Sequence, residues 1–183
     1  MRKISLIAIL CALCAALYAQ SLDGAPASSS RVTVDPVSDV KVPAGLKTPV
    51  TFTFRIQQGF HVNSNKPASP ELIPTLISFS PPPDLVIAKL QYPDGVLTSF
   101  PFDPAEKLSV YSGTVSVKAM VLAQPNASPG PYTVHGELKY QACDNNSCYP
   151  PKKVPVVFTV KVTPAPKTAP RAHGNAQSPH IHN

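Results

Sequence analysis

The sequence lacks tryptophan, and it has only 8 glycines and 4 cysteines among 183 residues. It also lacks a glycine-rich phosphate loop, a helix-borne metal motif and a serine in a nucleophile-elbow pattern. Charged residues make up 14% of the chain, and its lysines are scattered and not interleaved with aromatic residues. This composition gives no indication of a nucleic-acid-binding surface, and no cofactor or metal site is expected.

Proline is abundant instead, with 23 residues. Internal prolines remove helix hydrogen bonds, so long helices are disfavoured. Short β-rich runs separated by turn signals recur, and several alternate apolar with polar residues as half-buried antiparallel strands do. We therefore predict an all-β, immunoglobulin-like antiparallel β-sandwich of about seven strands. The expected strands are VTV (32–34), VTFTFRI (50–56), PTLISFS (74–80), LVIAKLQY (85–92), VYSGTVSVKAMVLA (110–123), YTVHGELKYQA (132–142) and VPVVFTVKV (154–162).

The N-terminus has the order of residues typical of a secretory signal peptide. Arg2 and Lys3 precede an apolar run that ends near Leu17, and small residues follow. This run is shorter than the roughly 20 residues that span a bilayer, although an uncleaved anchor is the alternative. Cleavage near Ala19 would lower the formal net charge from +6 to +4. The predicted organisation is a signal peptide (1–19), a linker (20–30), one folded domain (31–162) and a disordered Pro/Ala/His-rich tail (163–183).

Residues 140–151 read YQACDNNSCYPP and contain the cysteines that would remain after export, Cys143 and Cys148. An oxidising compartment lets them form a disulfide. The four residues between them are turn formers, and a hairpin would place the cysteines on facing strands. Closing so short a ring restrains the unfolded chain by only about 2 kcal/mol, against about 4.7 for 100 residues. A protruding turn, however, gives an attacking thiolate access to the sulfurs, so the residues alone leave a structural and a redox role open.

This segment resembles the active-site segment of the N-terminal periplasmic domain of the thiol:disulfide interchange protein DsbD. The shared features are a tyrosine before the first cysteine, a short polar turn, and Tyr-Pro-Pro after the second cysteine. Upstream, GFHVNSNKP (59–67) and ELIPT (71–75) resemble the first half of family members that occur as separate secreted proteins. The turn here has four residues, where the better-known members carry five.

The resemblance implies an immunoglobulin-like fold in the periplasm and a redox-active cysteine pair. A membrane-embedded electron donor, acting in trans, would reduce the pair, which would pass electrons to periplasmic thioredoxin-like or other disulfide-containing proteins. It also implies that Cys148 meets these partners and that Cys143 is the sheltered resolving thiol. The prolines after Cys148 favour the same order, because they cannot supply ladder donors that would bury this edge.

The family shields its disulfide with a cap loop that bears aromatic residues before a glycine. The nearest match is VYSG (110–113), which makes Tyr111 the cap candidate, with an ordinary strand tyrosine as the alternative. Tyr140, Tyr149 and Pro150 complete the expected surroundings of the active site.

Four other interpretations accompany this one. The competing function is a non-catalytic immunoglobulin-like protein-binding module whose disulfide is structural. A zinc site at the cysteines is a poor match, because no second ligand pair follows at finger-like spacing. His61 is interpreted as a hydrogen-bonding loop residue, with a binding role as the alternative. The tail histidines His173, His180 and His182 are interpreted as a feature without a metal role, with adventitious metal capture as the alternative. The sequence does not indicate an oligomeric state.

Overall fold

The computed structural model describes residues 30–101 and 103–167. The chain divides into two compact units, Met1–Ser30 and Arg31–Asn183, and the fold described below is that of the second unit. The predicted signal peptide, nearly all of the predicted linker and most of the predicted tail lie outside the described residues. The described part of the chain contains strands and no helix, hence no helix that could cross a membrane. The predicted all-β class is confirmed.

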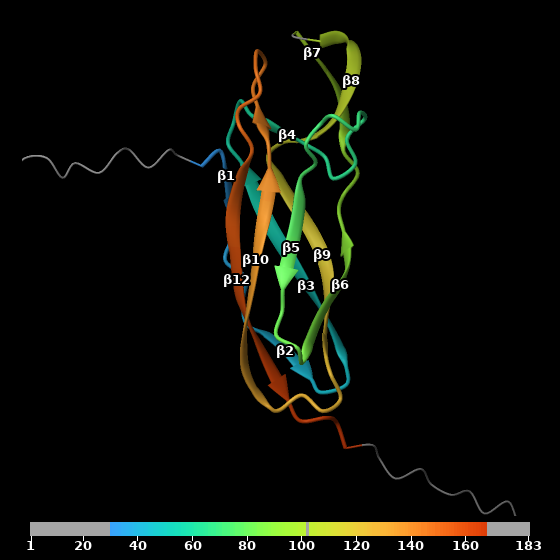
Figure 1. Cartoon of the computed structure of the whole chain (residues 1–183), viewed down its shortest axis with the longest axis vertical. Helices are drawn as coiled ribbons and strands as arrows, with labels where there is room; N and C mark the ends of the chain where they lie inside the picture. The colour runs from blue at the N-terminus through green and yellow to red at the C-terminus, as the bar shows by residue number, and fades with distance from the viewer. Residues whose placement is uncertain (1–29, 102, 168–183) are drawn as a thin grey trace, which may run out of the picture. The chain divides into compact units, whose positions relative to one another are not determined.

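Among the described residues, twelve strands form three sheets of four strands each (Figure 1). Sheet A has the order β1 (Val32–Val34), β3 (Lys47–Ile56), β9 (Thr114–Ala123) and β6 (Leu85–Gln91). Sheet B has the order β2 (Val40–Pro43), β12 (Lys152–Thr163), β10 (Gly130–Tyr140) and β5 (Leu76–Ser80). Sheet C has the order β11 (Ala142–Cys143), β4 (His61–Asn63), β8 (Asp103–Tyr111) and β7 (Val96–Phe100).

Sheets A and B form the sandwich, because their strands alternate buried apolar residues with exposed polar residues. In β9, for example, Val117 is fully buried while the neighbouring Lys118 is exposed. Phe52 of sheet A joins the two sheets, with its ring centroid 4.7 Å from that of Phe79 and 5.3 Å from that of Phe158, both in sheet B. The predicted immunoglobulin-like antiparallel sandwich is confirmed, with one parallel pair, β2 with β12, as an addition.

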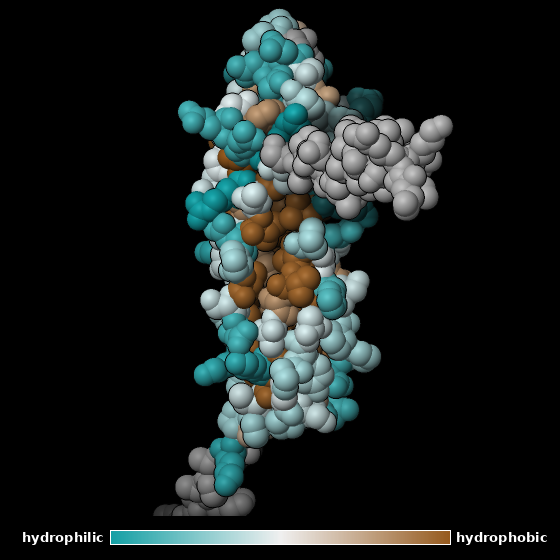
Figure 2. Space-filling view, turned by 90° about the vertical axis from the view of Figure 1, so that its left-hand side faces the viewer, coloured by the Kyte–Doolittle hydropathy of each residue, from teal (hydrophilic) through white to brown (hydrophobic). Residues whose placement is uncertain are grey.

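One edge of sheet B is only partly covered. β2 pairs with Val160–Thr163 of β12, so that residues 152–159 have β10 as their strand partner. Pro155 lies in this stretch, where a residue without an N–H blunts an edge against further pairing. Figure 2 shows apolar surface on the side of the sandwich where β1 and β12 lie, and Val157 of β12 is 52% exposed.

Sheet C lies at the end of the sandwich opposite β2 (Figure 1). Directly paired residues of a sheet share a face, so the register places Val62, Tyr111 and Ala142 on the face that joins the main core. The next residues along these strands, including His61 and Cys143, lie on the other face. That face carries a second, smaller cluster of buried residues, made up of Phe100, Leu108 and Val110.

The expected strands correspond to the sandwich and miss sheet C almost entirely. No strand was predicted at β2, β4 or β7, and the run predicted at 110–123 combines the end of β8 with all of β9. The break within this run lies at Gly113, whose φ of 65° is a left-handed conformation that glycine adopts readily.

Candidate functional site

The two cysteines form a disulfide at the tip of the hairpin made by β10 and β12. These strands pair without a break over eleven residue pairs, up to Tyr140 opposite Lys152. Beyond this ladder, Cys143 and Cys148 form an isolated antiparallel bridge, with their Cα atoms 4.0 Å apart and their sulfurs bonded. The predicted hairpin with facing cysteines is confirmed.

The turn between the cysteines is organised by the carboxylate of Asp144. Its Oδ1 accepts hydrogen bonds from the backbone amides of Asn146 at 2.8 Å and Ser147 at 2.9 Å. The hydroxyl of Tyr149 donates to Oδ2 at 2.7 Å. The bond from Tyr149, followed by the two amides and the nearby charge of Arg31, lowers the pKa of Asp144. The turn is therefore held by a carboxylate that stays ionised at a lower pH than an ordinary aspartate does.

The two cysteines differ sharply in exposure. Cys143 is 1% exposed, because β11 pairs with β4 and places this residue against sheet C. Cys148 comes after the turn and is exposed. Pro150, also exposed, follows shortly after it. Cys143 is therefore the more sheltered cysteine of the pair, in the order of exposure predicted from the sequence.

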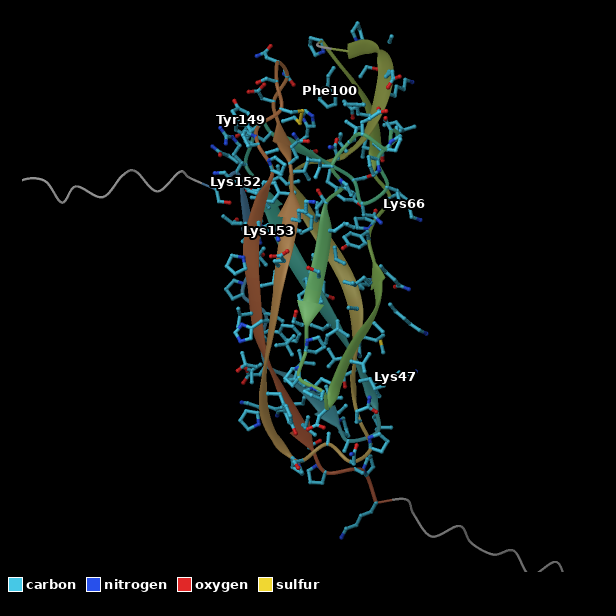
Figure 3. All side chains as sticks on the ribbon, in the orientation of Figure 1. Lys47, Lys66, Phe100, Tyr149, Lys152 and Lys153 are labelled. Carbon is cyan, nitrogen blue, oxygen red and sulfur yellow. A yellow bond between two sulfur atoms is a disulfide. The ribbon has the colours of Figure 1, made fainter. Side chains whose placement is uncertain are left out.

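His61 lies directly opposite Cys143 in the pairing of β4 with β11. Its ring stacks on that of Phe100, with centroids 3.9 Å apart and planes inclined by 15°. His61 is 5% exposed and Phe100 is 7% exposed. Figure 3 shows Phe100 at the end of the unit where the yellow disulfide lies. A histidine and a phenylalanine thus pack on the face of sheet C that carries Cys143.

The sequence interpretation of His61 as a hydrogen-bonding loop residue is corrected by this arrangement. His61 belongs to β4, and its Nε2 is buried without a hydrogen-bond partner. Burial lowers the pKa of His61, and the charge of Asp144 acts in the opposite direction. The imidazole is therefore neutral near pH 7, with a ring nitrogen free to accept a proton.

Tyr111, the cap candidate from the sequence, lies on the opposite face of sheet C and is 4% exposed. Its hydroxyl is 2.6 Å from Oδ1 of Asn65 and 2.8 Å from the carbonyl oxygen of Pro93. Both of these residues line a cavity of about 410 Å³, which also includes Tyr92 and Ser109. The register does not bring Tyr111 to the face that carries Cys143.

Of the other residues predicted around the active site, Tyr140 lies in the core and Tyr149 lies nearer the surface. Tyr140 is 1% exposed and belongs to the main core. Tyr149 lies beside the disulfide hairpin (Figure 3), with its ring centroid 5.8 Å from that of Phe60. The guanidinium of Arg31 lies 3.6 Å from the centre of the Tyr149 ring, in a cation–π contact. Tyr149 is therefore held at two points, its ring by Arg31 and its hydroxyl by Asp144.

Sequence reasoning missed Phe100, Arg31 and Phe60 as neighbours of the cysteine hairpin. Phe100 was marked by one signal, an aromatic residue in the proline-interrupted segment SFPF (99–102). Arg31 and Phe60 lie far from the cysteines in the sequence. They directly precede β1 and β4, and the pairing of those strands brings them to the site. Within the described residues, no three potential ligands gather in a manner that could hold a metal ion.

The fold and the site define an immunoglobulin-like β-sandwich that carries a disulfide at the tip of a hairpin, with one sulfur exposed and the other buried. Residues 29–160 match the family model of the N-terminal domain of thiol:disulfide interchange protein DsbD, and the chain belongs to this family. The resemblance stated from the sequence is thereby confirmed. No curated protein matches the chain.

Several solved structures are similar to this chain. The reduced N-terminal domain of Neisseria meningitidis DsbD is 22% identical over 64% of this chain and 82% of its own, with a TM-score of 0.41. A complex of the DsbD and PilB N-terminal domains from the same organism gives 22% identity, coverages of 75% and 87%, and a TM-score of 0.40. The N-terminal periplasmic domain of ScsB from Proteus mirabilis is 12% identical over 74% of this chain and 47% of its own, with a TM-score of 0.42.

Proposed function

We propose that this protein is a periplasmic thiol:disulfide exchange module that transfers electrons through Cys143 and Cys148. The donor is a membrane-embedded reductant acting in trans, and the acceptors are periplasmic thioredoxin-like or other disulfide-containing proteins. The observation that carries the proposal is the division of one disulfide into an exposed sulfur and a buried sulfur at the tip of a hairpin. Membership of the DsbD N-terminal family supports the same chemistry.

The exchange proceeds in two displacements. A thiolate of the donor attacks Sγ of Cys148, which forms a mixed disulfide and releases Cys143 as a thiolate. A second donor thiolate then attacks the donor's own sulfur, so that Cys148 leaves and the pair holds two electrons as a dithiol. In the transfer to an oxidised acceptor, the Cys148 thiolate attacks the acceptor disulfide, and Cys143 resolves the mixed disulfide by attacking Cys148.

Phe100, in place of Tyr111, is the aromatic residue that we propose as the shield of Cys143. It stacks on His61, whose strand pairs with Cys143, and it is nearly buried itself. A cover on the buried sulfur directs incoming thiols to Cys148. The hairpin of β7 and β8, which carries Phe100, would move aside or adjust when a protein partner docks.

The proposed acceptor is a protein, and in a Neisseria meningitidis structure a DsbD N-terminal domain forms a complex with a PilB N-terminal domain. The cysteine hairpin protrudes from the end of the β10–β12 ladder (Figure 1), and Cys148 is exposed there. An exposed sulfur on a protruding hairpin suits a partner that presents its own thiol in a cleft.

The proposal is tested by the reduction potential of the pair, measured by equilibration with thiol/disulfide buffers. An exchanging disulfide should lie above about −300 mV and should be reduced by a reduced thioredoxin-like protein within minutes. The Cys143→Ser/Cys148→Ser variant is the control for any other redox signal. A potential below about −300 mV, together with resistance to the thioredoxin-like donor, would favour the non-catalytic binding module with a structural disulfide.

A further inference from the structure

His61 carries a buried polar atom that the oxidised protein leaves unused. Its Nε2 is buried and has no hydrogen-bond partner. Buried polar groups without partners are rare in proteins, because each one loses its hydrogen bonds to water without a replacement. An atom of this kind is available to a partner that forms in another state of the molecule.

Reduction of the disulfide creates such a partner. The Sγ atoms of the oxidised pair carry no proton, whereas a reduced Cys143 carries an S–H group that can donate. Cys143 and His61 are direct partners in an antiparallel pair. The Cβ atoms of residues paired in this way lie about 4.5–5.5 Å apart with their side chains on one face. An imidazole is long enough to reach a sulfur across this distance.

The surroundings hold the imidazole in place on this face. The Phe100 ring covers one side of it at 3.9 Å, and both rings are almost removed from solvent. Cys143 is itself 1% exposed, so its thiol has little water to which it could lose a proton. A buried thiol has a raised pKa and is a poor nucleophile unless a base stands beside it.

We propose that His61 is the proton acceptor for Cys143 when Cys143 resolves the mixed disulfide, an inference that rests on the exchange function proposed above. It adds to that function a base for the second displacement, from a residue outside the cysteine segment. Cys148 requires no such base, because its sulfur is exposed to solvent.

The step balances as follows. In the mixed disulfide, Cys148 is bonded to a partner sulfur and Cys143 is a thiol. The Cys143 proton moves to Nε2 of His61 while Sγ of Cys143 attacks Sγ of Cys148. The bond from Cys148 to the partner breaks, and the partner sulfur leaves with the electron pair as a thiolate. The pair has then lost two electrons to the partner, and the imidazolium returns its proton to the departing thiolate or to water.

The groups around His61 are suited to this role. Asp144, which follows Cys143 in the hairpin, is the charged group that acts on His61 and favours its protonated form. Asp144 is itself bonded to Tyr149, Asn146 and Ser147. From β7 the contact is the uncharged ring of Phe100, and β8 places Tyr111 and Val110 opposite the next residues of β4. His61 therefore starts neutral and is stabilised by a neighbouring carboxylate when it becomes charged.

The experiment is a single-turnover reaction of the reduced protein with an aromatic disulfide reagent whose thiolate product is coloured. The first coloured product reports the attack by Cys148, and the second reports the resolution by Cys143. His61→Gln preserves the polar side chain but removes the base, and His61→Asn is a second, smaller variant. His135→Gln is the matched control, because His135 is exposed on β10.

We expect the second phase to slow about 10-fold or more in both His61 variants at pH 7, with the first phase and the His135→Gln variant unchanged. In the wild type, the second phase should rise with pH through a midpoint below the ordinary histidine value of about 6.5. In His61→Gln, it should rise only toward the thiol range near about 8.5.

A second phase with the wild-type rate and pH profile in the His61 variants would overturn the inference and leave the exchange function intact. A wild type that shows no first phase would instead contradict the exchange function itself. If neither variant folds, the wild-type profile decides: a midpoint below about 6.5 supports His61, and a single rise near about 8.5 excludes it.

Discussion

Cys143 and Cys148 are bonded to each other across one antiparallel bridge, yet Cys143 is 1% exposed while Cys148 is open to solvent. We expect Cys143→Ser to accumulate a covalent complex with a thioredoxin-like partner, because the adduct on Cys148 has lost its resolving thiol. Cys148→Ser should trap little, since its remaining sulfur is buried. Non-reducing gels measure both. The reverse pattern would exchange the roles of the two sulfurs.

The fold should survive the loss of the disulfide. The ring between Cys143 and Cys148 is short, so the Cys143→Ser/Cys148→Ser variant should lose only about 2 kcal/mol of unfolding free energy. For a domain of this size, the midpoint of thermal unfolding should fall by roughly 5–10 °C. Circular dichroism at 25 °C should still show a folded β protein. Complete unfolding of this variant would identify the disulfide as a structural staple.

Substitutions at Phe100 and at Tyr111 should differ in their effect on the rate of disulfide reduction. Phe100→Ala removes the ring that stacks on His61, so reduction of the disulfide by a small thiol should accelerate several-fold. Tyr111→Phe removes a hydroxyl bonded to Asn65 on the other face of sheet C, and the rate of reduction should stay unchanged. Stopped-flow reduction compares the two variants. Acceleration in Tyr111→Phe alone would restore Tyr111 as the cap.

The cysteine turn should loosen in acid. The pKa of Asp144 is lowered in the folded state, so its carboxylate stabilises the turn fully above the ordinary aspartate value of about 3.9. This contribution is lost as the pH falls through the lower, folded-state pKa. The amide shifts of Asn146 and Ser147, followed by nuclear magnetic resonance, should titrate with a midpoint below about 3.9. Asp144→Asn should abolish the titration, and an ordinary midpoint would contradict the assignment.

The sandwich could be predicted from the sequence because its strands alternate apolar with polar residues. In β9, buried Val115, Val117 and Ala119 alternate with polar residues, and this pattern predicts a half-buried strand without any knowledge of its partners. The cysteine hairpin was accessible for a similar reason, since four turn-forming residues separate its two thiols. Both features are encoded within short segments.

Sheet C could not be predicted from the sequence, because its strands form through pairing with one another and carry no local strand pattern. All three residues of β4 are buried, so no alternation marks this strand. β8 begins with DPAEK, a charged segment with a proline, which local propensity assigns to a loop. The stacking of His61 on Phe100 joins β4 to β7, and neither of these strands was predicted. The site around the buried sulfur therefore required the three-dimensional structure.

The long ladder of β10 and β12 has a consequence for how the turn can vary in length. Eleven consecutive pairs fix the register up to Tyr140 and Lys152, and a slip by one residue would turn every side chain of the strand to the other face. The ladder fixes the strand that leads to Cys143, and the pairing of β11 with β4 then turns Cys143 inward. The turn has no part in setting this orientation. An inserted turn residue should tilt the exposed sulfur toward a different approach direction while its partner stays where it is. In this chain, turn length is then a means of changing how Cys148 faces a docking partner without rebuilding the half of the site that holds Cys143.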